Sequence, residues 1–220
     1  MLIIINPDNR KFFKRELDDF FKLRKTILID QRGWALSAQN GKEIDAYDHD
    51  QAHYLLYRFQ DTGEVLGGVR LTPTLRPNLT LNIFSHLINP DIGFTPSHQV
   101  WESSRLVTVK EQKTIPASIL KDITLTLFIG MVEYGLLQHI HSLLMLTEIR
   151  LERIGRMVRW NLKRLGPVER VGNTLAVVGL AEVSEKTKKD IRRSCNFWKP
   201  VFEKQYHKSF HCPSLYRGET

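Results

Sequence analysis

The chain has 220 residues, of which 42% are hydrophobic and 25% charged, and its formal net charge is +8. These values are typical of a globular protein and exclude a fibrous or disordered chain, and the length favours one domain. The two cysteines, Cys195 and Cys212, are too few for a disulfide framework or a four-cysteine zinc site, which favours a reducing compartment. The positive charge suits an acidic partner, although solubility alone would also account for it.

No segment predicts export or membrane insertion. The apolar start at residues 1–5 is short and has no basic region before it, unlike a signal peptide. The longest apolar run, residues 123–132, is about half of the roughly twenty residues that a membrane span needs. We therefore expect a cytoplasmic protein. The eight histidines show no ligand spacing, so we expect no metal, and no recognition motif predicts nucleic-acid binding.

The first half of the chain predicts one helix followed by strands. Residues 10–25 place their apolar side chains on one helical stripe, and residues 26–51 are polar and irregular, so we expect a long loop. Strands are predicted at residues 52–59 and 65–71, joined by a turn at Asp61-Thr62-Gly63. A proline-rich link leads to a short segment around Phe84, and a further strand is expected at residues 100–109.

The second half predicts alternating helices and strands. Helices are expected at residues 117–137, at 149–165 with basic residues on its outer faces, and from Ser184 to about Asn196. Strands are expected at residues 141–147, 168–171 and 175–180. Strands that give way to alternating helices and strands indicate a mixed sheet covered by helices in a single α/β or α+β domain.

Charged residues beside apolar strands are the features that point to chemistry. The common catalytic and nucleotide-binding motifs are absent from the sequence. Three carboxylates, Glu43, Asp45 and Asp48, follow one another closely, and Glu102 and Arg105 share a strand. Burying such charges costs several kcal/mol unless each is paired. They form either a solvated acidic loop with a structural ion pair or a site for a cationic small molecule that carries an amine.

The same residues resemble a known family in their order and spacing. The anchors are Arg24, Trp34, Glu43-x-Asp45-x-x-Asp48, Gly68-x-Arg70-Leu-x-Pro73-Thr74, Phe84 and Trp101-Glu102-x-Ser-Arg105. This arrangement resembles the acyl-homoserine-lactone synthases, the autoinducer synthases of bacterial quorum sensing. The resemblance covers roughly residues 20–165, and its first half is the specific part. Leu28 stands where the family usually carries an aromatic residue.

The resemblance implies a fold and a division of the chain. The implied fold is a single-domain, three-layer α/β/α sandwich with a mixed sheet, similar to the GCN5-related N-acyltransferases. Residues 1–51 would hold the N-terminal helix and a loop that covers the substrate. Residues 52–180 would form the core of sheet and helices, and residues 181–220 the C-terminal helix and tail.

The implied reaction joins S-adenosylmethionine to an acyl chain delivered on acyl carrier protein. Its products would be an N-acyl-homoserine lactone, 5′-methylthioadenosine and free carrier protein, with S-adenosylmethionine as a substrate and no cofactor. One alternative is a GCN5-like N-acyltransferase that uses acyl-coenzyme A, although the glycine-rich loop usual in such enzymes is missing. The other alternative is a basic nucleic-acid-binding module, which we disfavour because basic and aromatic residues are not interleaved.

Three strand residues are the expected catalytic set. An ammonium is not a nucleophile, so a base must take its proton directly or through a water, and the resemblance assigns this role to Glu102. Glu102 could instead only anchor Arg105. The oxyanion of the tetrahedral intermediate needs preorganised donors, for which Ser103 and backbone N–H groups of residues 102–105 are candidates. The thioester is already activated, so we expect Cys195 and Cys212 to be dispensable.

The remaining assignments concern binding. The resemblance assigns S-adenosylmethionine binding and ordering of the loop to Arg24, Trp34, Glu43, Asp45, Asp48, Arg70 and Phe84. An apolar tunnel for the acyl chain would include Val100, Met145 and Thr147. Acyl carrier protein is acidic, so complementary charge would guide it to a basic surface. That surface would be formed by Arg150, Arg153, Arg156, Arg159 and Lys163, unless these residues are merely a solvated helix face.

Overall fold

The computed structural model describes residues 1–110 and 115–204, which build one mixed sheet. The strand order is β1-β2-β3-β4-β5-β8-β6, with β7 paired to β8. Only β4 and β5 run parallel, and the other pairs are antiparallel. The strands are β1 (Leu2–Ile5), β2 (His53–Arg58), β3 (Val65–Pro73), β4 (Val100–Thr108), β5 (Ser142–Glu148), β6 (Leu162–Arg164), β7 (Glu169–Val171) and β8 (Thr174–Glu182).

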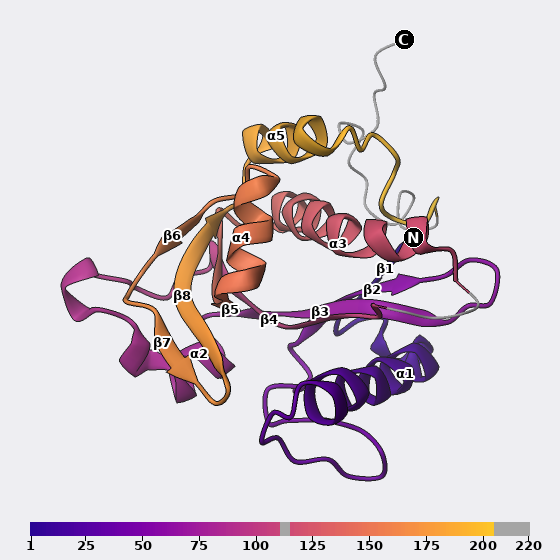
Figure 1. Cartoon of the computed structure of the whole chain (residues 1–220), viewed down its shortest axis with the longest axis horizontal. Helices are drawn as coiled ribbons and strands as arrows, with labels where there is room; N and C mark the ends of the chain where they lie inside the picture. The colour runs from indigo at the N-terminus through magenta and orange to yellow at the C-terminus, as the bar shows by residue number, and fades with distance from the viewer. Residues whose placement is uncertain (111–114, 205–220) are drawn as a thin grey trace.

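Helices cover both faces of this sheet (Figure 1). Below it in that view lie α1 (Lys14–Arg24) and α2 (Leu79–Ile83), which contact β3, β4 and β5. Above it lie α3 (Ala117–Leu137), which crosses β1, β2 and β3, and α4 (Ile149–Met157), which packs on β5, β6 and β8. The last helix, α5 (Glu185–Cys195), packs on α3. The predicted single domain of three α/β/α layers with a mixed sheet is therefore confirmed.

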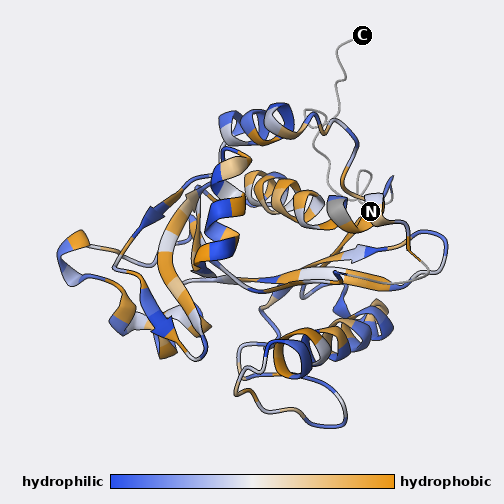
Figure 2. Cartoon of the chain, viewed as in Figure 1, coloured by the Kyte–Doolittle hydropathy of each residue, from blue (hydrophilic) through white to orange (hydrophobic). Residues whose placement is uncertain are grey.

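The apolar core forms mainly between the sheet and α3. That helix is hydrophobic on nearly all sides in Figure 2, because the sheet covers one face and α5 part of the other. The predicted bounds of this helix, residues 117–137, are confirmed. The last helix begins as predicted at Ser184, whose hydroxyl accepts a hydrogen bond from the backbone N–H of Thr187 at 3.0 Å.

The N-terminal part differs from the prediction in two ways. Residues 2–5 form β1, a fully buried edge strand paired with β2, so the sheet begins far ahead of the expected boundary at residue 52. The last strand of the sheet, β8, ends at Glu182, just past the boundary between core and C-terminal part that was expected at residue 180. The first residues of the expected loop, Lys25–Gln31, instead continue α1 as a π-helix (η2). Four consecutive apolar residues show no alternation, so periodicity could not reveal β1.

The prediction of one helix over residues 149–165 is wrong. Helix α4 ends at Met157, Arg159 adopts a left-handed conformation with φ of 64°, and residues 162–164 form β6 beside β8. The buried ring of Trp160 explains the break. It packs edge-on against Phe128 at 5.2 Å, and its Nε1 donates to the carbonyl of Glu182 at 2.8 Å. Burying this large aromatic side chain outweighs the preference of the basic residues for a longer helix.

A bulge in β4 shapes the centre of the sheet. Arg105 has φ of 56°, and the register with β3 shifts between the pair Gly68–Val107 and the pair Arg70–Ser104. On its other side, β4 pairs with β5 only from Val100 to Ser103. Beyond Ser103 the two strands are no longer paired, although both continue. The strands therefore separate beside Arg105, where the functional residues gather.

Candidate active site

Three arginines and three carboxylates form a buried cluster on the α1 side of the sheet. Arg24 comes from α1, Arg70 from β3 and Arg105 from β4, while Glu43, Asp45 and Asp48 come from the loop between η2 and β2. The Nη2 of Arg24 lies 2.5 Å from Glu43, and its Nη1 lies 2.7 Å from Asp48. The structure thus brings together six of the residues that the sequence singled out.

The other two arginines complete the network. Arg70 lies 2.5 Å from Asp45 and 3.0 Å from Asp48, and Arg105 lies 2.7 Å from Asp45 and 3.1 Å from Glu43. Three positive charges therefore face three negative ones, which is the condition under which charges can be buried. Arg24 and Arg70 are fully buried, so this cluster is not the solvated acidic loop considered as an alternative.

Neighbouring opposite charges keep the side chains of this cluster ionised. Burial alone would lower the pKa of the Arg24 guanidinium, but Asp48 and Glu43 beside it raise that pKa above its ordinary value. Burial alone would raise the pKa of the Asp48 carboxyl, but Arg24 and Arg70 hold it well below its usual range. The Tyr54 hydroxyl also donates to Asp48 at 2.9 Å. Arg24 and Asp48 are therefore both ionised near neutral pH.

Glu102 lies on the same face of the sheet as the cluster and is fully buried. Its carboxylate accepts hydrogen bonds from the backbone N–H groups of Leu79 at 3.3 Å and Thr80 at 2.5 Å, at the start of α2. The alternative that Glu102 only anchors Arg105 is wrong, because the Arg105 guanidinium bonds Glu43 and Asp45 instead. The Glu102 carboxylate is thus held by backbone donors, and no arginine nitrogen of the described residues lies within 4.0 Å of it, although the charge of Glu102 helps to raise the pKa of the Arg70 guanidinium.

Ser103 does not share this face. Its hydroxyl donates to the sulfur of Met131 on α3 at 3.3 Å, because successive strand residues point to opposite sides. The Ser103 side chain therefore lies across the sheet from the Glu102 carboxylate, which corrects the prediction that this side chain joins Glu102 in the site. On the β5 side of β4 the backbone pairing ends at Ser103, whereas on the β3 side it continues at Ser104, Val107 and Thr108.

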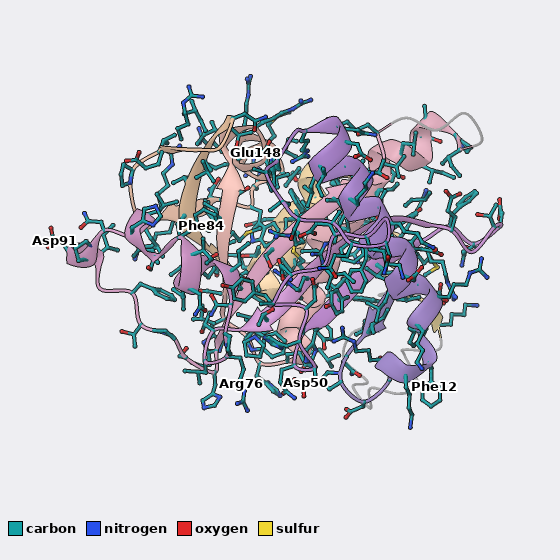
Figure 3. The ribbon with its side chains drawn as sticks, turned by 90° about the horizontal axis from the view of Figure 1, so that it is seen from below. Phe12, Asp50, Arg76, Phe84, Asp91 and Glu148 are labelled. Atoms are coloured by element: carbon teal, nitrogen blue, oxygen red, sulfur yellow. The ribbon has the colours of Figure 1, made fainter. Side chains whose placement is uncertain are left out.

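Two aromatic residues with predicted roles lie apart from the charged cluster. Trp34 follows η2, and the Arg32 guanidinium lies 5.8 Å from the centre of its ring. The Trp34 Nε1 is buried and has no hydrogen-bond partner within residues 1–110 and 115–204. Phe84 follows α2 and packs against the apolar cluster around Leu144. Figure 3 shows Phe84 toward the end of the molecule that carries Asp91, with Phe12 at the opposite end.

The predicted acyl-chain residues, one on β4 and two on β5, are divided between the two faces of the sheet. Met145 and Thr147 line a pocket of about 20 Å³ on the α3–α4 side, closed by Phe128 and Trp160. The Thr147 hydroxyl is buried there, and no described residue forms a hydrogen bond with it. Val100 instead packs on the other face with the cluster around Leu144, so it does not line this pocket. A volume near that of one water molecule holds no acyl chain unless the surrounding side chains move.

The five predicted docking residues are all exposed, although they do not lie on one helix. Three of them are on α4, and Arg159 and Lys163 lie on the link to β6 and on β6 itself. Arg156 lies 3.5 Å from Glu152, which Arg164 also binds at 2.8 Å.

Within the described ranges, no group of three or more His, Cys, Asp or Glu side chains is arranged to hold a metal ion. No helix of the described part is long and apolar enough to cross a membrane.

Three residues of the site were not singled out from the sequence. Tyr54 bonds Asp48, and Thr72 and Thr80 lie beside Glu102, with Thr72 directly opposite it in the β3–β4 register. Alternation along residues 70–74 and 100–104 could have placed Thr72 on the face of Arg70 and Glu102. No local pattern could have indicated Thr80, which reaches Glu102 from a separate helix.

Comparison with known proteins decides the family. The family model described as autoinducer synthase matches residues 8–191 of this chain. The chain belongs to this family. An acyl-homoserine-lactone synthase from Agrobacterium fabrum is 33% identical over 180 residues, which cover 81% of this chain and 84% of that protein. The predicted family and the acyltransferase type of enzyme are therefore confirmed.

Solved structures agree with this assignment. The acyl-homoserine-lactone synthase LasI has a TM-score of 0.73 and 27% identity, and the match covers 87% of this chain and 93% of that one. A coenzyme-A-dependent synthase, BjaI, was solved with S-adenosylmethionine and isopentyl-coenzyme A; its TM-score is 0.80 at 24% identity, covering 90% of each chain. An acyl-coenzyme A N-acyltransferase from Pseudomonas aeruginosa has a TM-score of 0.51 at 11% identity, covering 82% of this chain and 98% of that one, which supports the predicted similarity of fold.

Proposed function

We propose that this autoinducer synthase acylates the amine of S-adenosylmethionine from an acyl thioester and then closes the lactone ring. The observation that carries the proposal is the buried Glu102 carboxylate, which shares one face of the sheet with the balanced cluster of three arginines and three carboxylates. Family membership and the synthase named in Agrobacterium fabrum support the same reaction. The products would be an N-acyl-homoserine lactone, 5′-methylthioadenosine and the free thiol of the donor.

In the acylation step, Glu102 takes a proton from the substrate amine, whose nitrogen then attacks the thioester carbonyl carbon. As the tetrahedral intermediate collapses, the C–S bond breaks and the nitrogen loses its second proton, the leaving thiolate takes up one proton, and the proton held by Glu102 returns to solvent. Backbone N–H groups of β4 beside Arg105, where β4 and β5 separate, stabilise the oxyanion. A general base typically contributes a factor of about 10²–10⁴ to the rate.

In the lactonisation step, the substrate carboxylate attacks the carbon bonded to the sulfonium. That C–S bond breaks and 5′-methylthioadenosine leaves as a neutral thioether, so the step needs no further proton transfer. The task of the protein is to fold the chain into the ring-closing geometry. The charged cluster serves this purpose by ordering the loop that holds Glu43, Asp45 and Asp48, while the ring of Trp34 offers a face to the adenine or the sulfonium.

We propose acyl carrier protein as the donor, because five exposed basic residues lie on α4, on β6 and between them. Four of them, Arg150, Arg153, Arg159 and Lys163, have no carboxylate within 4.0 Å among the described residues, so their charges are available to an acidic partner. Acyl-coenzyme A is the second candidate, because BjaI is named as coenzyme-A-dependent and coenzyme A also carries negative charge. We further propose that the reaction takes place in the cytoplasm.

The test is product analysis by mass spectrometry with the purified chain and S-adenosylmethionine, supplied in parallel with acyl carrier protein thioesters and acyl-coenzyme A thioesters. An N-acyl-homoserine lactone from one donor alone identifies that donor and the acyl length. Glu102→Gln should lower kcat by about 10²-fold or more, whereas Glu169→Gln on the exposed strand β7 should not. Absence of lactone from every donor would overturn the proposed function.

A further inference from the structure

A second cleft lies between the start of α1 and the loop that carries Glu43, Asp45 and Asp48. Its volume is about 520 Å³, which is within the range of sites that bind small molecules. None of the six side chains of the charged cluster lines it. It lies with α1 below the sheet, whereas the basic surface on α4 lies above the sheet (Figure 1). The cleft is therefore separate from both regions whose functions are proposed above.

The floor of this cleft is apolar. Leu17 and Phe21 are four residues apart, so they share one face of α1, and they are 5% and 7% exposed. Ile44 of the loop completes the floor and is 49% exposed. A half-exposed isoleucine beside two buried apolar side chains leaves apolar surface in contact with water, which an apolar group of a ligand can cover.

The rim of the cleft is positively charged. Arg10, Lys11 and Lys14 line it, and the two lysines have no carboxylate within 4.0 Å among the described residues. The carboxylate of Asp18 is also on the cleft wall, but Lys42 already pairs with it. Two ammonium groups are thus available to an anion that enters the cleft.

The loop presents different residues to its two sides. The backbone N–H of Glu43 donates to the carbonyl of Phe21 at 3.1 Å, which places the loop along α1. The Glu43 carboxylate points inward to Arg24, whereas Lys42 and Ile44, its neighbours in the chain, line the cleft. The charged cluster and the cleft therefore use opposite sides of one loop, so a ligand in the cleft leaves the pairs of Glu43 intact.

We propose that this cleft binds a soluble phosphate ester that carries an aromatic or apolar group, such as a nucleoside monophosphate. The phosphate contacts Arg10, Lys11 and Lys14, and the rest of the ligand lies on the apolar floor. The carbonyls of His49 and Asp48 hold the Arg10 guanidinium at 2.6 and 3.0 Å through two of its five N–H groups, which leaves the others for the phosphate.

Charge and shape favour this class of ligand over two others. Three cations suit a phosphate ester, which carries about 1.5–2 negative charges near pH 7, better than a carboxylate, which carries one. The apolar floor is formed by side chains that are nearly buried, Leu17 and Phe21, so the surface of a lipid bilayer does not reach it. A small molecule that enters the cleft does.

The experiment measures binding of adenosine 5′-monophosphate (AMP) to the purified full chain by isothermal titration calorimetry at low ionic strength. Lys11→Gln combined with Lys14→Gln should raise the Kd for AMP about tenfold or more, because two charge-assisted contacts are lost. Arg150→Gln combined with Arg153→Gln is the matched control. It removes the same charge from α4 and should leave the Kd for AMP unchanged. All four side chains are exposed, so Tm should stay near the wild-type value in both variants.

Further arms test the apolar floor and the source of the phosphate. Ile44→Ser should raise the Kd for AMP about threefold and leave that for inorganic phosphate unchanged, because inorganic phosphate has no apolar group to place on the floor. Excess 5′-methylthioadenosine, which has no phosphate, should not displace AMP.

Four results would overturn the inference. The first two are a wild-type Kd for AMP in the lysine variant and an equal loss of affinity in the α4 variant. The third is displacement of AMP by 5′-methylthioadenosine, which would place AMP in the substrate site. The fourth is binding of the chain to phosphatidylglycerol vesicles without binding of AMP. None of these measurements requires lactone formation, so their failure is distinct from failure of the proposed function.

Discussion

His53 on β2 shows how burial decides the protonation of a single side chain. Its ring packs edge-on against Trp101 at 4.7 Å, and its Nδ1 lies 2.6 Å from the Tyr134 hydroxyl. Burial lowers the pKa of His53 to about 4 and raises the pKa of Tyr134 above its ordinary value. Both groups are neutral near pH 7, and His53 faces α3, which carries Tyr134, across the sheet from Glu102. His53 therefore contributes to packing and not to the proton transfer.

This packing predicts a pH dependence of stability. The pKa of His53 is lower in the folded chain, about 4, than its ordinary value near 6.5, so the unfolded chain binds more protons between these pH values. The free energy of unfolding should therefore fall by about 2 kcal/mol between pH 7.5 and pH 5 because of His53 alone. Urea unfolding at several pH values measures this loss. His53→Gln should flatten the profile in that window, and an unchanged slope would contradict the argument.

Individual elements meet at the charged cluster, where α1, β3 and β4 each supply one arginine to the same loop. No element can bury its own charge alone, because the partners of each arginine lie on the loop of residues 43–48. The order of this loop therefore depends on all three elements at once. This dependence suits a loop that must be held in one conformation over a substrate.

Removing one arginine should be far more harmful than breaking an exposed pair on the same helix. Arg24→Met leaves three buried carboxylates facing only Arg70 and Arg105, so one negative charge is unbalanced and the free energy of unfolding should fall by about 3–5 kcal/mol. Lys22→Met breaks the exposed pair with Asp18 and should cost far less, because solvent screens both charges. Urea unfolding of both variants measures the difference. Equal losses would show that the cluster is not a buried, mutually dependent network.

The basic surface also spans two elements, since α4 ends at Met157 and Lys163 lies on β6. Arg153→Glu combined with Lys163→Glu should raise the KM for acyl carrier protein about fivefold or more and leave the KM for S-adenosylmethionine unchanged, because only the charged donor is attracted there. Arg170→Glu on β7 is the control and should change neither value. Steady-state kinetics with varied carrier protein provides the measurement, and an unchanged carrier KM would remove this surface from docking.

On the scale of the whole molecule, the N-terminal segment reaches across to the C-terminal half of the sheet. Arg32 pairs with Glu148, at the end of β5, at 2.6 Å, and the Asn173 side chain donates to the Arg32 carbonyl at 2.7 Å. Figure 3 shows Glu148 far from Phe12, which lies near the start of α1. These contacts hold the turn that precedes Trp34 against the end of β5, the strand that carries Thr147. The residue predicted to bind S-adenosylmethionine and the residue predicted to bind the acyl chain are therefore connected through the Arg32–Glu148 pair.

The Arg32–Glu148 contact should contribute modestly to stability, because both side chains are partly exposed, at 28% and 23%. A double-mutant cycle with Arg32→Gln and Glu148→Gln should give a coupling energy of about 0.5–1 kcal/mol in urea unfolding. The Lys186–Asp190 pair within α5 offers a comparison, with a smaller expected coupling because the Lys186 side chain is 82% exposed. A coupling near zero for the first pair would mean that the segment is held by packing alone.

The amino-acid sequence by itself determined the family, the three-layer fold and most element boundaries. Helix α3 and the strands β2, β3 and β4 follow from periodicity, which is a local property of the chain. The six members of the charged cluster were also identified from the sequence, because their spacing matches the family even though they come from four separate segments.

Only the tertiary structure decided which of these residues meet. Trp160 ends α4 early because its ring is buried against Phe128, and Ser103 turns away from Glu102 because the strand alternates. Arg105 binds the loop carboxylates, and the Glu102 carboxylate accepts backbone hydrogen bonds from the start of α2. Partners such as these depend on contacts between distant segments, whose free energies outweigh local preference and leave no periodic mark in the sequence.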